Sequence, residues 1–405
     1  MKDFSNKRIL ITQNDIYSIN GSAVIVLELA HFLKNANAEV TVYTYFKHDP
    51  LKSIFEEHGI FVTDSDDMLL LDDFDYIWVH QQVLPLSIIR GLERIHEKNK
   101  PPVFIFNHMS SLDYIADEFP YIWDLENNLA SLSLFNSPET KEAQEGLLSN
   151  DILKMLYQNP APKYFSELKR SNTHEIKKIL VISNHPPQEI VDLKEKFIKS
   201  DIELVLLGEN QDKYRLIDLD LIGEYDLVIS IGKTVQNCLV ANIPVYVYDH
   251  FGGPGYLDNF NINLAENKNF SGRGFEKKTS EEIYSDITDN YSAATEFMEA
   301  NNEIFIEKFT IDNLIVDILK CAKKKTFPKL DSRYVTYLVY SHNYSREHRI
   351  AARQRMVYKH ELDQARTDLS ACYKENKDIK NSKSYKLGNK IAAPMRKIKK
   401  IGEYM

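Results

Sequence analysis

Short apolar stretches alternate with segments of helical periodicity along most of this chain, in two successive halves. In the helical segments, such as residues 23–35, apolar residues recur three and four positions apart. The apolar stretches have the length of strands and lie at 7–12, 39–45, 75–79, 103–106 and 132–136, and then at 177–183, 203–207, 227–230 and 245–248. Strands that alternate with helices form parallel sheets covered by helices. The sequence therefore predicts an α/β protein with two Rossmann-like domains that face each other across a cleft.

A proline-rich polar break at residues 158–162 separates the two halves. The amphipathic pattern at 313–324 predicts a helix that crosses back from the second domain toward the first. We expect four parts: an N-terminal Rossmann-like domain at 1–160, a C-terminal one at 161–328, a helical extension at 329–382 and a basic amphipathic tail at 383–405.

The composition narrows the class of protein. Of 405 residues, 43% are hydrophobic and 27% are charged, which is typical of a soluble globular protein. The net charge of −9 argues against a general nucleic-acid-binding surface. Three widely spaced cysteines fit a reducing compartment, and neither a signal peptide nor an apolar run long enough to cross a bilayer is recognisable. We therefore expect a cytoplasmic protein that binds no nucleic acid.

Glycines gather in one part of the second half. Of 14 glycines, five lie between residues 252 and 274. The apolar stretch 227–230 runs into Gly232-Lys233-Thr234 and a helix, and the stretch 245–248 runs into Gly252, Gly253 and Gly255. Glycines at strand ends let backbone N–H groups approach an anion, and the start of a helix attracts phosphate. We interpret the first turn as a phosphate site, the alternative being an ordinary strand-to-helix turn with Thr234 as N-cap.

Other motifs exclude several chemistries. A P-loop would need a glycine at the position of Leu227, so a nucleotide triphosphatase is not expected. No Gly-x-Ser-x-Gly turn is present, and no His, Cys or Glu cluster has metal-ligand spacing, so we expect no metal and no cofactor. Asp64-Ser65-Asp66 is interpreted as a solvated turn. Four histidines stand just after predicted strands or beside the glycine run; they are His80, His108, His185 and His250.

The last 75 or so residues have a different character. Tyr358, Leu362, Ala365, Leu369 and Cys372 follow a short heptad pattern, which leaves a solvated helix and a homo-oligomer equally open. In the tail, apolar residues fall on one helical face; they are Leu387, Ile391, Met395, Ile398 and Ile401. Basic residues cover the rest; they are Lys386, Lys390, Arg396, Lys397, Lys399 and Lys400. This pattern favours a helix on an anionic membrane surface, with a disordered basic tail, suggested by Pro394, as the alternative.

Several segments together resemble a known architecture. They are residues 19–22 with the helix and strand that follow, Phe106-Asn107-His108, the turn at 135–141, and the segment 231–245 with its donor-phosphate helix. These segments resemble the GT-B fold glycosyltransferases, in particular family 4, a retaining group of bacterial polysaccharide synthesis. The resemblance covers residues 7–325. The family usually carries two glutamates around the donor helix, and here Ile229 and Asn237 stand at those positions.

The resemblance implies a glycosyltransferase that moves a sugar from a nucleotide diphosphate sugar to a lipid-linked glycan at the inner face of the cell membrane, in capsule or other polysaccharide biosynthesis. It implies His108, Asp249 and His250 as the groups that contact the sugar or the acceptor. The implied donor-binding set is Gly21, Ser22, Asn184, His185, Gly232, Lys233, Thr234, Val235, Gly252, Gly253, Ser271 and Arg273. Two alternatives stay open: a non-catalytic module that binds glycan or nucleotide sugar and supports a partner transferase, and a sugar epimerase of the same fold.

Overall fold

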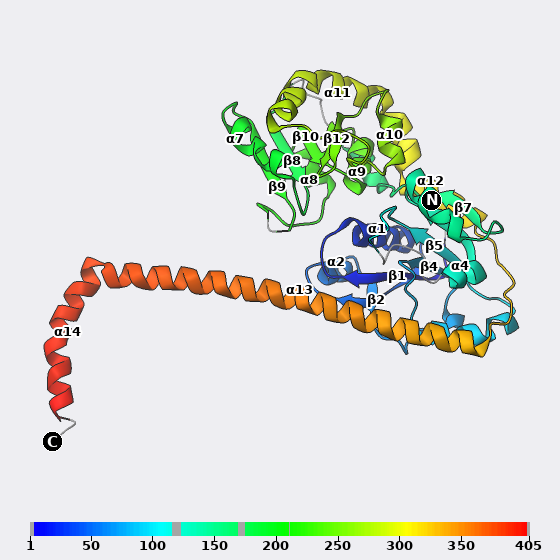
Figure 1. The fold of residues 1–405 in the computed structure, drawn as a ribbon, viewed down its shortest axis with the longest axis horizontal. Coiled ribbons are helices and arrows are strands. Elements are labelled where there is room, and N and C mark those ends of the chain that lie inside the picture. The colour runs from blue at the N-terminus through cyan, green and yellow to red at the C-terminus, as the bar shows by residue number, and fades with distance from the viewer. Residues whose placement is uncertain (1–3, 116–122, 169–174, 210, 403–405) are drawn as a thin grey trace. The chain divides into compact units, whose positions relative to one another are not determined.

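The computed structural model describes residues 4–115, 123–168, 175–209 and 211–392, and the backbone alone of 393–402. The chain divides into a compact unit, residues 1–345, and a helical unit, residues 346–405. Residues 1–345 contain two sheets with helices on their faces (Figure 1).

The first sheet has seven parallel strands in the order β3-β2-β1-β4-β5-β6-β7. They are β1 (Arg8–Ile16), β2 (Glu39–Lys47), β3 (Phe61–Thr63), β4 (Tyr76–His80), β5 (Val103–His108), β6 (Ala130–Phe135) and β7 (Leu153–Leu156). The helices that connect these strands are α1 (Gly21–Asn35), α2 (Leu51–Glu57), α3 (Leu86–Gly91), α4 (Trp123–Leu129) and α5 (Pro138–Gln144). Short 3₁₀ helices lie at Leu71–Asp73, Leu92–Glu97, Glu145–Leu147 and Lys163–Glu167.

The second sheet has the order β12-β11-β10-β8-β9. Its strands are β8 (Lys178–Ile182), β9 (Glu203–Leu207), β10 (Leu227–Ser230), β11 (Val245–Asp249) and β12 (Gly252–Tyr256). Strands β8 to β11 are parallel, and β12 pairs antiparallel with β11. The helices are α6 (Gln188–Val191), α7 (Leu193–Ile198), α8 (Leu219–Gly223), α9 (Lys233–Ala241), α10 (Ile262–Asn267), α11 (Ser280–Phe309) and α12 (Ile311–Cys321).

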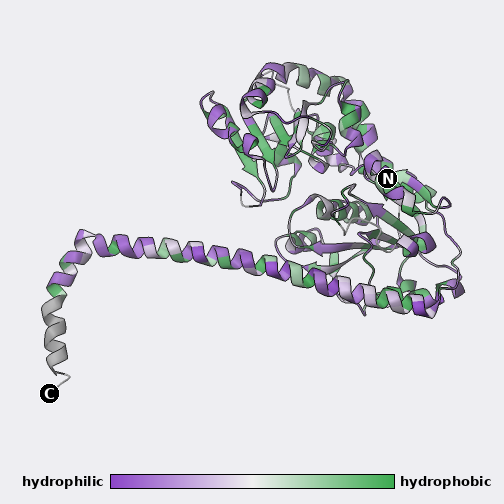
Figure 2. Ribbon diagram, viewed as in Figure 1, coloured by the Kyte–Doolittle hydropathy of each residue, from purple (hydrophilic) through white to green (hydrophobic). Residues whose placement is uncertain are grey.

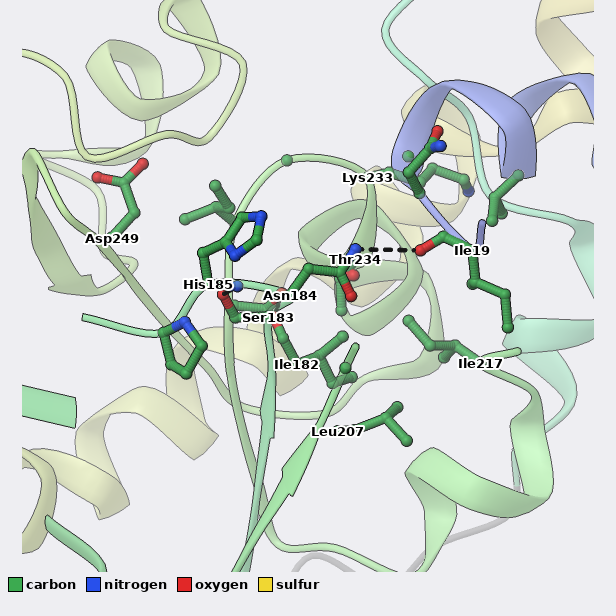
Figure 3. Close-up of a pocket in the computed structure, with 18 of the residues that line it drawn as sticks. Ile19, Ile182, Ser183, Asn184, His185, Leu207, Ile217, Lys233, Thr234 and Asp249 are labelled. Carbon is green, nitrogen blue, oxygen red and sulfur yellow. Dashed lines mark hydrogen bonds between the residues drawn. The ribbon is translucent and has the colours of Figure 1, made fainter. Parts of the chain in front are cut away.

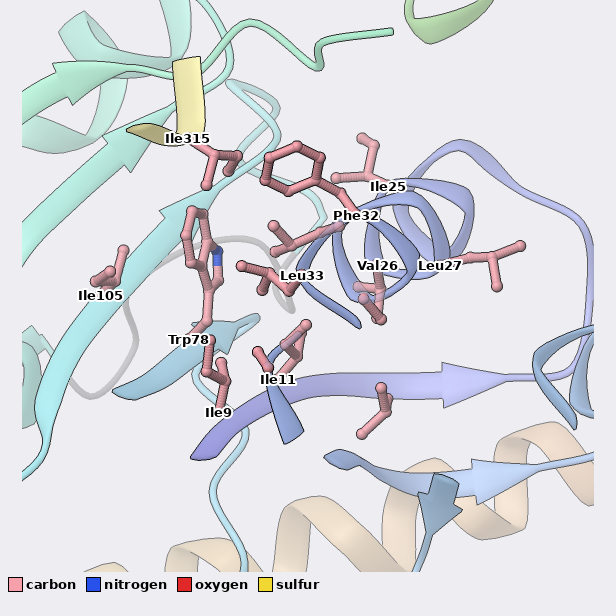
Figure 4. Packing of buried hydrophobic residues seen from close by; sticks show 14 of the residues in the cluster. Ile9, Ile11, Ile25, Val26, Leu27, Phe32, Leu33, Trp78, Ile105 and Ile315 are labelled. Carbon is pink, nitrogen blue, oxygen red and sulfur yellow. The ribbon is translucent and has the colours of Figure 1, made fainter. Parts of the chain in front are cut away.

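The chain passes twice between the two domains, and the two passages pair with each other. The Ala161 N–H donates to the Phe309 carbonyl at 2.7 Å, and the Ile311 N–H donates to the Ala161 carbonyl at 2.9 Å. Helix α12 then buries Ile315 in the core of the first domain, against the layer that contains Trp78 and α1 (Figure 4). The end of the second domain is thereby part of the first domain's core.

Two long helices complete the chain, α13 (Ser332–Asn381) and α14 (Lys383–Gly402). The first turns of α13 pack on the first domain through the buried side chains of Val335, Leu338 and His342. Figure 2 shows that β8, β9 and β10 of the second sheet are largely hydrophobic, whereas α13 is mostly hydrophilic with isolated hydrophobic residues. Among the described residues, no helix is both long and apolar enough to cross a membrane.

The interpretation of Asp64-Ser65-Asp66 as a solvated turn is wrong for Asp66. Its carboxylate accepts hydrogen bonds from the Tyr43 hydroxyl and from the Leu86 N–H, and lies 3.2 Å from Nε2 of His342. Burial raises the pKa of Asp66, but the hydrogen bonds from His342 and Tyr43 outweigh it and lower the pKa to about 2. Asp66 therefore anchors the start of α13 to the first domain.

Candidate functional site

A cavity of about 530 Å³ lies where the two domains face each other. On the second domain its wall is made by residues that end or follow parallel strands: Ser183 after β8, Gly208 after β9, Ile231 after β10 and Asp249 at the end of β11. On the first domain the wall is the start of α1 and the segments after β5 and β6. Open α/β sheets bind ligands at this edge, and the volume suits a small organic ligand.

Helix α9 begins inside this cavity. Gly232 is its N-cap and has φ +56° and ψ −132°, a left-handed conformation that favours glycine, and its N–H donates to the Phe270 carbonyl at 3.0 Å. The alternative with Thr234 as N-cap is therefore wrong. Lys233 and Thr234 form the first turn and line the cavity. N–H groups in the first turn of a helix lack partners within the helix and favour an anion.

The side chain of Lys233, in contrast, is occupied by the protein. Its ammonium donates to the Pro160 carbonyl at 2.9 Å and to Oδ1 of Asn237 at 2.6 Å, and lies 2.9 Å from Oε2 of Glu28 on α1. Burial lowers the pKa of Lys233 and raises the pKa of Glu28, because each charge is removed from water. Two of the three ammonium hydrogens are used by these hydrogen bonds, and the contact with Glu28 is an ion pair. The geometry thus gives this side chain a structural role across the cleft rather than the predicted contact with a diphosphate.

Arg273 is also engaged with the opposite domain. Its Nη2 donates to Oε2 of Glu139, in the first turn of α5, at 2.6 Å, and Lys268 donates to Oε1 of the same carboxylate at 2.9 Å. Burial raises the pKa of Glu139, but Arg273 and Lys268 outweigh it, so the pKa is lowered. Arg273 does not line the cavity in the described structure. This placement argues against the diphosphate contact predicted for it.

The glycine run that was expected to approach a ligand is part of the sheet. Strand β12 brings Gly253 so close to β11 that a Cβ there would lie 2.1 Å from the Val247 carbonyl oxygen. A Cβ at Gly252 would lie 2.4 Å from the Glu276 carbonyl oxygen. These glycines let protein backbones meet and lie outside the cavity lining, as do Val235 and Ser271. Val235 is fully buried, and the Ser271 hydroxyl donates to the Lys268 carbonyl at 2.8 Å.

His108 lies inside the first domain. Strand β5 continues to this residue, its side chain is 3% exposed, and its Nε2 lies 2.8 Å from Oε1 of the buried Glu126. Its ring stacks on Phe135 with centroids 4.9 Å apart. The next two residues, Met109 and Ser110, line the cavity instead. This placement argues against the predicted contact between His108 and the sugar or acceptor.

The other two predicted sugar-contacting residues do line the cavity. Asp249 uses both carboxylate oxygens for the protein: Oδ1 accepts from the Phe251 N–H at 2.7 Å and Oδ2 from the Gly272 N–H at 3.1 Å. The carboxylate therefore fixes two loops beside the cavity. His250 is exposed, as is His185, and both line the cavity.

The loop before α1 closes the cavity against the second domain. The Ile19 N–H donates to the Tyr214 hydroxyl at 2.7 Å. Asn184 Nδ2 donates to the Ile19 carbonyl at 3.2 Å (Figure 3). Gly21 and Ser22 follow at the start of α1 and line the cavity. The predicted residues that the structure brings together at the cavity are Gly21, Ser22, Asn184, His185, Gly232, Lys233, Thr234, Asp249 and His250.

Sequence reasoning missed two buried asparagines in the cavity wall. Asn136 is 2% exposed and donates from Nδ2 to the Met109 carbonyl at 2.6 Å, and Asn159 is 4% exposed and donates to Oδ1 of Asn269 at 3.2 Å. In the described part of the chain, Oδ1 of each has no hydrogen-bond partner. Buried acceptors of this kind are normally satisfied, so these two amides are polar groups of the wall that the described side chains leave without a partner. Asn136 lies in the turn 135–141, one of the segments on which the resemblance to GT-B glycosyltransferases rests.

The comparisons with known proteins bear on the fold. No protein-family model and no curated protein matches the sequence. The structure is similar to HepE of Anabaena in complex with UDP and glucose, at 14% identity, over 78% of this chain and 100% of that chain, with a TM-score of 0.50. It is also similar to an α-glucosyltransferase in complex with UDP and a 13-mer DNA containing an HMU base, at 10% identity, over 78% of this chain and 99% of that chain, with a TM-score of 0.52.

These similarities and the two facing Rossmann-like domains define the class: the chain has the GT-B glycosyltransferase fold with a C-terminal helical extension, as predicted. The particular assignment to family 4 stays a prediction. Among the described residues, no group of three or more His, Cys, Asp or Glu side chains is arranged to hold a metal ion.

Proposed function

We propose that this protein is a glycosyltransferase whose donor, a nucleotide diphosphate sugar, binds in the cavity between the two domains. The observation that carries the proposal is the start of α9 in that cavity, at the carboxyl ends of β8 to β11. Both solved structures of similar fold contain UDP, and one of them also contains glucose. A nucleotide diphosphate sugar supplies the anion that a helix N-terminus attracts and fits the volume.

The diphosphate would lie over the first turn of α9. The N–H groups of Lys233 and Thr234 and the Thr234 hydroxyl would donate to it, while the Lys233 side chain keeps its contact with Glu28. As the sugar leaves, negative charge grows on the diphosphate, and fixed N–H dipoles stabilise it without reorganisation. His185 and His250, exposed in the same cavity, are further donors for this group.

The transferred sugar and the acceptor would lie toward the first domain. Asn136 and Asn159 line this part of the wall with their Oδ1 atoms buried, so each side chain would turn toward the cavity to accept a hydrogen bond from a sugar hydroxyl, and Ser110 would line the acceptor side. A hydroxyl that donates to a buried acceptor without a partner offsets the free energy that the desolvation of this acceptor costs, about 1–3 kcal/mol. Asp249 would hold the loops that bound this region rather than react itself.

We further propose that the acceptor is a lipid-linked glycan in cell-surface polysaccharide synthesis, and that α14 holds the protein on the inner face of the membrane. Leu387 and Ile391 lie one helical turn apart and are 61% and 66% exposed, with Lys386 and Lys390 exposed beside them. Apolar and basic residues in this arrangement favour an anionic lipid surface. The side chains of Met395, Ile398, Ile401 and the later basic residues lie outside the described part of the chain.

The purified full-length protein and a panel of UDP-, GDP- and TDP-sugars test the donor assignment. We expect one or more sugars to raise the melting temperature and to be hydrolysed or transferred. Binding without turnover, with every acceptor offered, would instead support the non-catalytic module. The feature that favours that alternative is Asn237, a buried amide in the cavity wall where the resemblance places a glutamate. No stabilisation by any nucleotide sugar would contradict the donor assignment and would leave only a module that binds glycan.

A further inference from the structure

The part of α13 beyond residue 345 carries a row of residues spaced alternately four and three apart. We call this row the seam; it consists of Tyr358, Leu362, Ala365, Leu369, Cys372, Asn376 and Ile379. Every member except Asn376 is apolar or a thiol, and the row covers three heptads. Such a row is the surface along which helices meet in a coiled coil.

The seam is exposed in the chain by itself. The side chains of Leu362, Leu369 and Ile379 are 50%, 56% and 50% exposed, and that of Tyr358 is 64% exposed. Long helices in water owe most of their stability to the packing of an apolar face, since backbone propensity alone is marginal. Within the described residues, nothing covers this face, so a helix of this length needs a partner.

We propose that this partner is a second copy of the chain, and that the two α13 helices form a parallel, in-register, two-stranded coiled coil along the seam. In heptad notation Leu362, Leu369 and Asn376 occupy a positions, and the other seam members occupy d positions. A single Asn at an a position meets the same Asn of the second copy only in this register, and it favours two strands. Ala365 and Cys372 are small and let the helices approach closely.

The charges beside the seam favour the same arrangement. Acidic residues stand at all three flanking g positions, Glu361, Asp368 and Glu375, and basic residues stand five residues later at two of the corresponding e positions, Arg366 and Lys380, with Tyr373 at the third. In a parallel pair, each g residue faces the e residue of the next heptad on the other helix. Glu361 would therefore face Arg366 of the second copy, and Glu375 would face its Lys380.

An antiparallel pair would place g residues against g and e against e, so acids would meet acids and bases would meet bases. The contact that Arg366 makes in the single chain is with Asp363, at 3.5 Å on the exposed surface. Exposed pairs of this kind contribute little and exchange readily. The charge pattern therefore selects the parallel dimer over the antiparallel one.

Cys372 gives a direct test of register, because it is exposed and occupies a d position. In the proposed dimer its thiol lies next to the same thiol of the second copy. Copper-catalysed oxidation by dissolved oxygen removes two protons and two electrons from two thiols and forms one S–S bond. We expect full-length protein to give a covalent dimer on a non-reducing gel, and the Cys372→Ser variant to give none. A dimer band that persists in Cys372→Ser, or no band in the native chain, would overturn the register.

The oligomeric state provides a second test with a matched control. Ala365→Asp puts a charge into the seam, and Ala371→Asp puts the same charge on the opposite face of the same helix. By sedimentation equilibrium of the full chain, we expect twice the chain mass for the native protein and for Ala371→Asp, and the single chain mass for Ala365→Asp. A native monomer, a native trimer or equal masses for the two variants would overturn the proposal.

Charge reversal tests the pairing of the flanks. Glu361→Lys with Glu375→Lys should dissociate the dimer, and adding Arg366→Glu with Lys380→Glu to the same chain should restore it. Retention of the dimer in the first double variant would show that these pairs do not select the partner. Donor binding is read in parallel and should be unchanged in all of these variants, which separates this proposal from the proposed function.

Discussion

The ammonium of Lys233 on the second domain lies 2.9 Å from the Glu28 carboxylate on the first, and their side chains are 7% and 11% exposed. The same ammonium bonds to the Pro160 carbonyl, where the chain passes between the domains. This contact joins α1, α9 and the interdomain passage at one point beside the cavity. The donor helix is thereby positioned by the opposite domain.

The first prediction concerns the contribution of this ion pair to the free energy of unfolding. Removing one partner of a buried pair leaves an uncompensated charge, so Lys233→Ala should lower the free energy of unfolding by about 3–5 kcal/mol. Glu28→Ala together with Lys233→Ala should recover part of that loss. Urea unfolding measures both, with Lys320→Ala on the exposed face of α12 as a control that changes little. Unchanged stability with loss of nucleotide affinity would restore the diphosphate role to this side chain.

The second prediction concerns the turn at Gly232. An L-residue at φ +56° and ψ −132° is strained by about 1–3 kcal/mol, so Gly232→Ala should shift the start of α9. Nucleotide diphosphate affinity should fall with it, by roughly tenfold for a loss of about 1.4 kcal/mol. Calorimetric titration measures the affinity. Gly146→Ala is the matched control, because Gly146 has open space around its Cβ position. Equal affinities for the two variants would contradict a phosphate site at this turn.

The third prediction concerns Asn136. If Asn136 binds a sugar hydroxyl, Asn136→Ala should remove about 0.5–1.5 kcal/mol of transition-state stabilisation, which lowers kcat/KM by roughly twofold to thirteenfold. The variant also loses the bond to the Met109 carbonyl, so unfolding free energies are measured beside the kinetics. Asn128→Ala serves as the control, because Asn128 lies on α4 outside the cavity lining. A variant that loses stability but keeps native kcat/KM would remove Asn136 from the binding site.

The fourth prediction concerns pH. Burial lowers the pKa of His80 from 6.5 to about 3, and the neighbouring His108 adds to the effect. The folded chain therefore keeps this imidazole neutral, while the unfolded chain protonates it below about 6.5. The stability that it contributes is complete above pH 6.5 and is lost as the pH falls toward 3, by about 1.4 kcal/mol per pH unit.

Unfolding free energies at pH 7.5 and 5.5 test this sign. From pH 7.5 to pH 5.5 the free energy of unfolding of the native chain should fall by about 1.4 kcal/mol more than that of the His80→Asn variant. Only the last of these two pH units lies below the pKa that His80 has in the unfolded chain. The same loss in both proteins would mean that His80 binds its proton in the folded chain as readily as in water.

The fifth prediction concerns α14. Each Lys near an anionic surface contributes about 1 kcal/mol at low salt, and reversal of Lys386 and Lys390 to Glu should remove most sedimentation with anionic vesicles. Deletion of residues 383–405 should abolish it but spare transfer to a lipid-free acceptor analogue. Reversal of Lys323 and Lys324 is the control. If the deleted protein sediments with the vesicles as the full chain does, α14 is not the anchor.

The alternation of strand and helix was readable from the sequence because burial imposes a period that each segment carries alone. Strand β12 was not, because its residues Gly252, Gly253 and Pro254 have the composition of a turn and become a strand only through pairing with β11. His108 shows a related limit. Its strand continues two residues beyond the expected end at Phe106 and is buried along its whole length, so the ring lies inside the domain against Phe135.

The carboxylate partners of Lys233 and Arg273 could not be predicted from the sequence either. Glu28 and Glu139 lie far from Lys233 and Arg273 in sequence and meet them only after the two domains come together. A lysine beside a glycine turn has the same local pattern whether it binds phosphate or a carboxylate. The start of α9 could be predicted because a helix N-terminus is a local feature, whereas the fate of a long charged side chain depends on tertiary contacts.

The central claim is that a nucleotide diphosphate sugar binds over the start of α9. A crystal structure of the full-length protein soaked with the donor that stabilises it tests this most directly. We expect the diphosphate within hydrogen-bond distance of the N–H groups of Lys233 and Thr234, with Lys233 Nζ still paired to Glu28. A diphosphate held elsewhere, or held by Lys233 Nζ and Arg273 after both have left their glutamates, would contradict it.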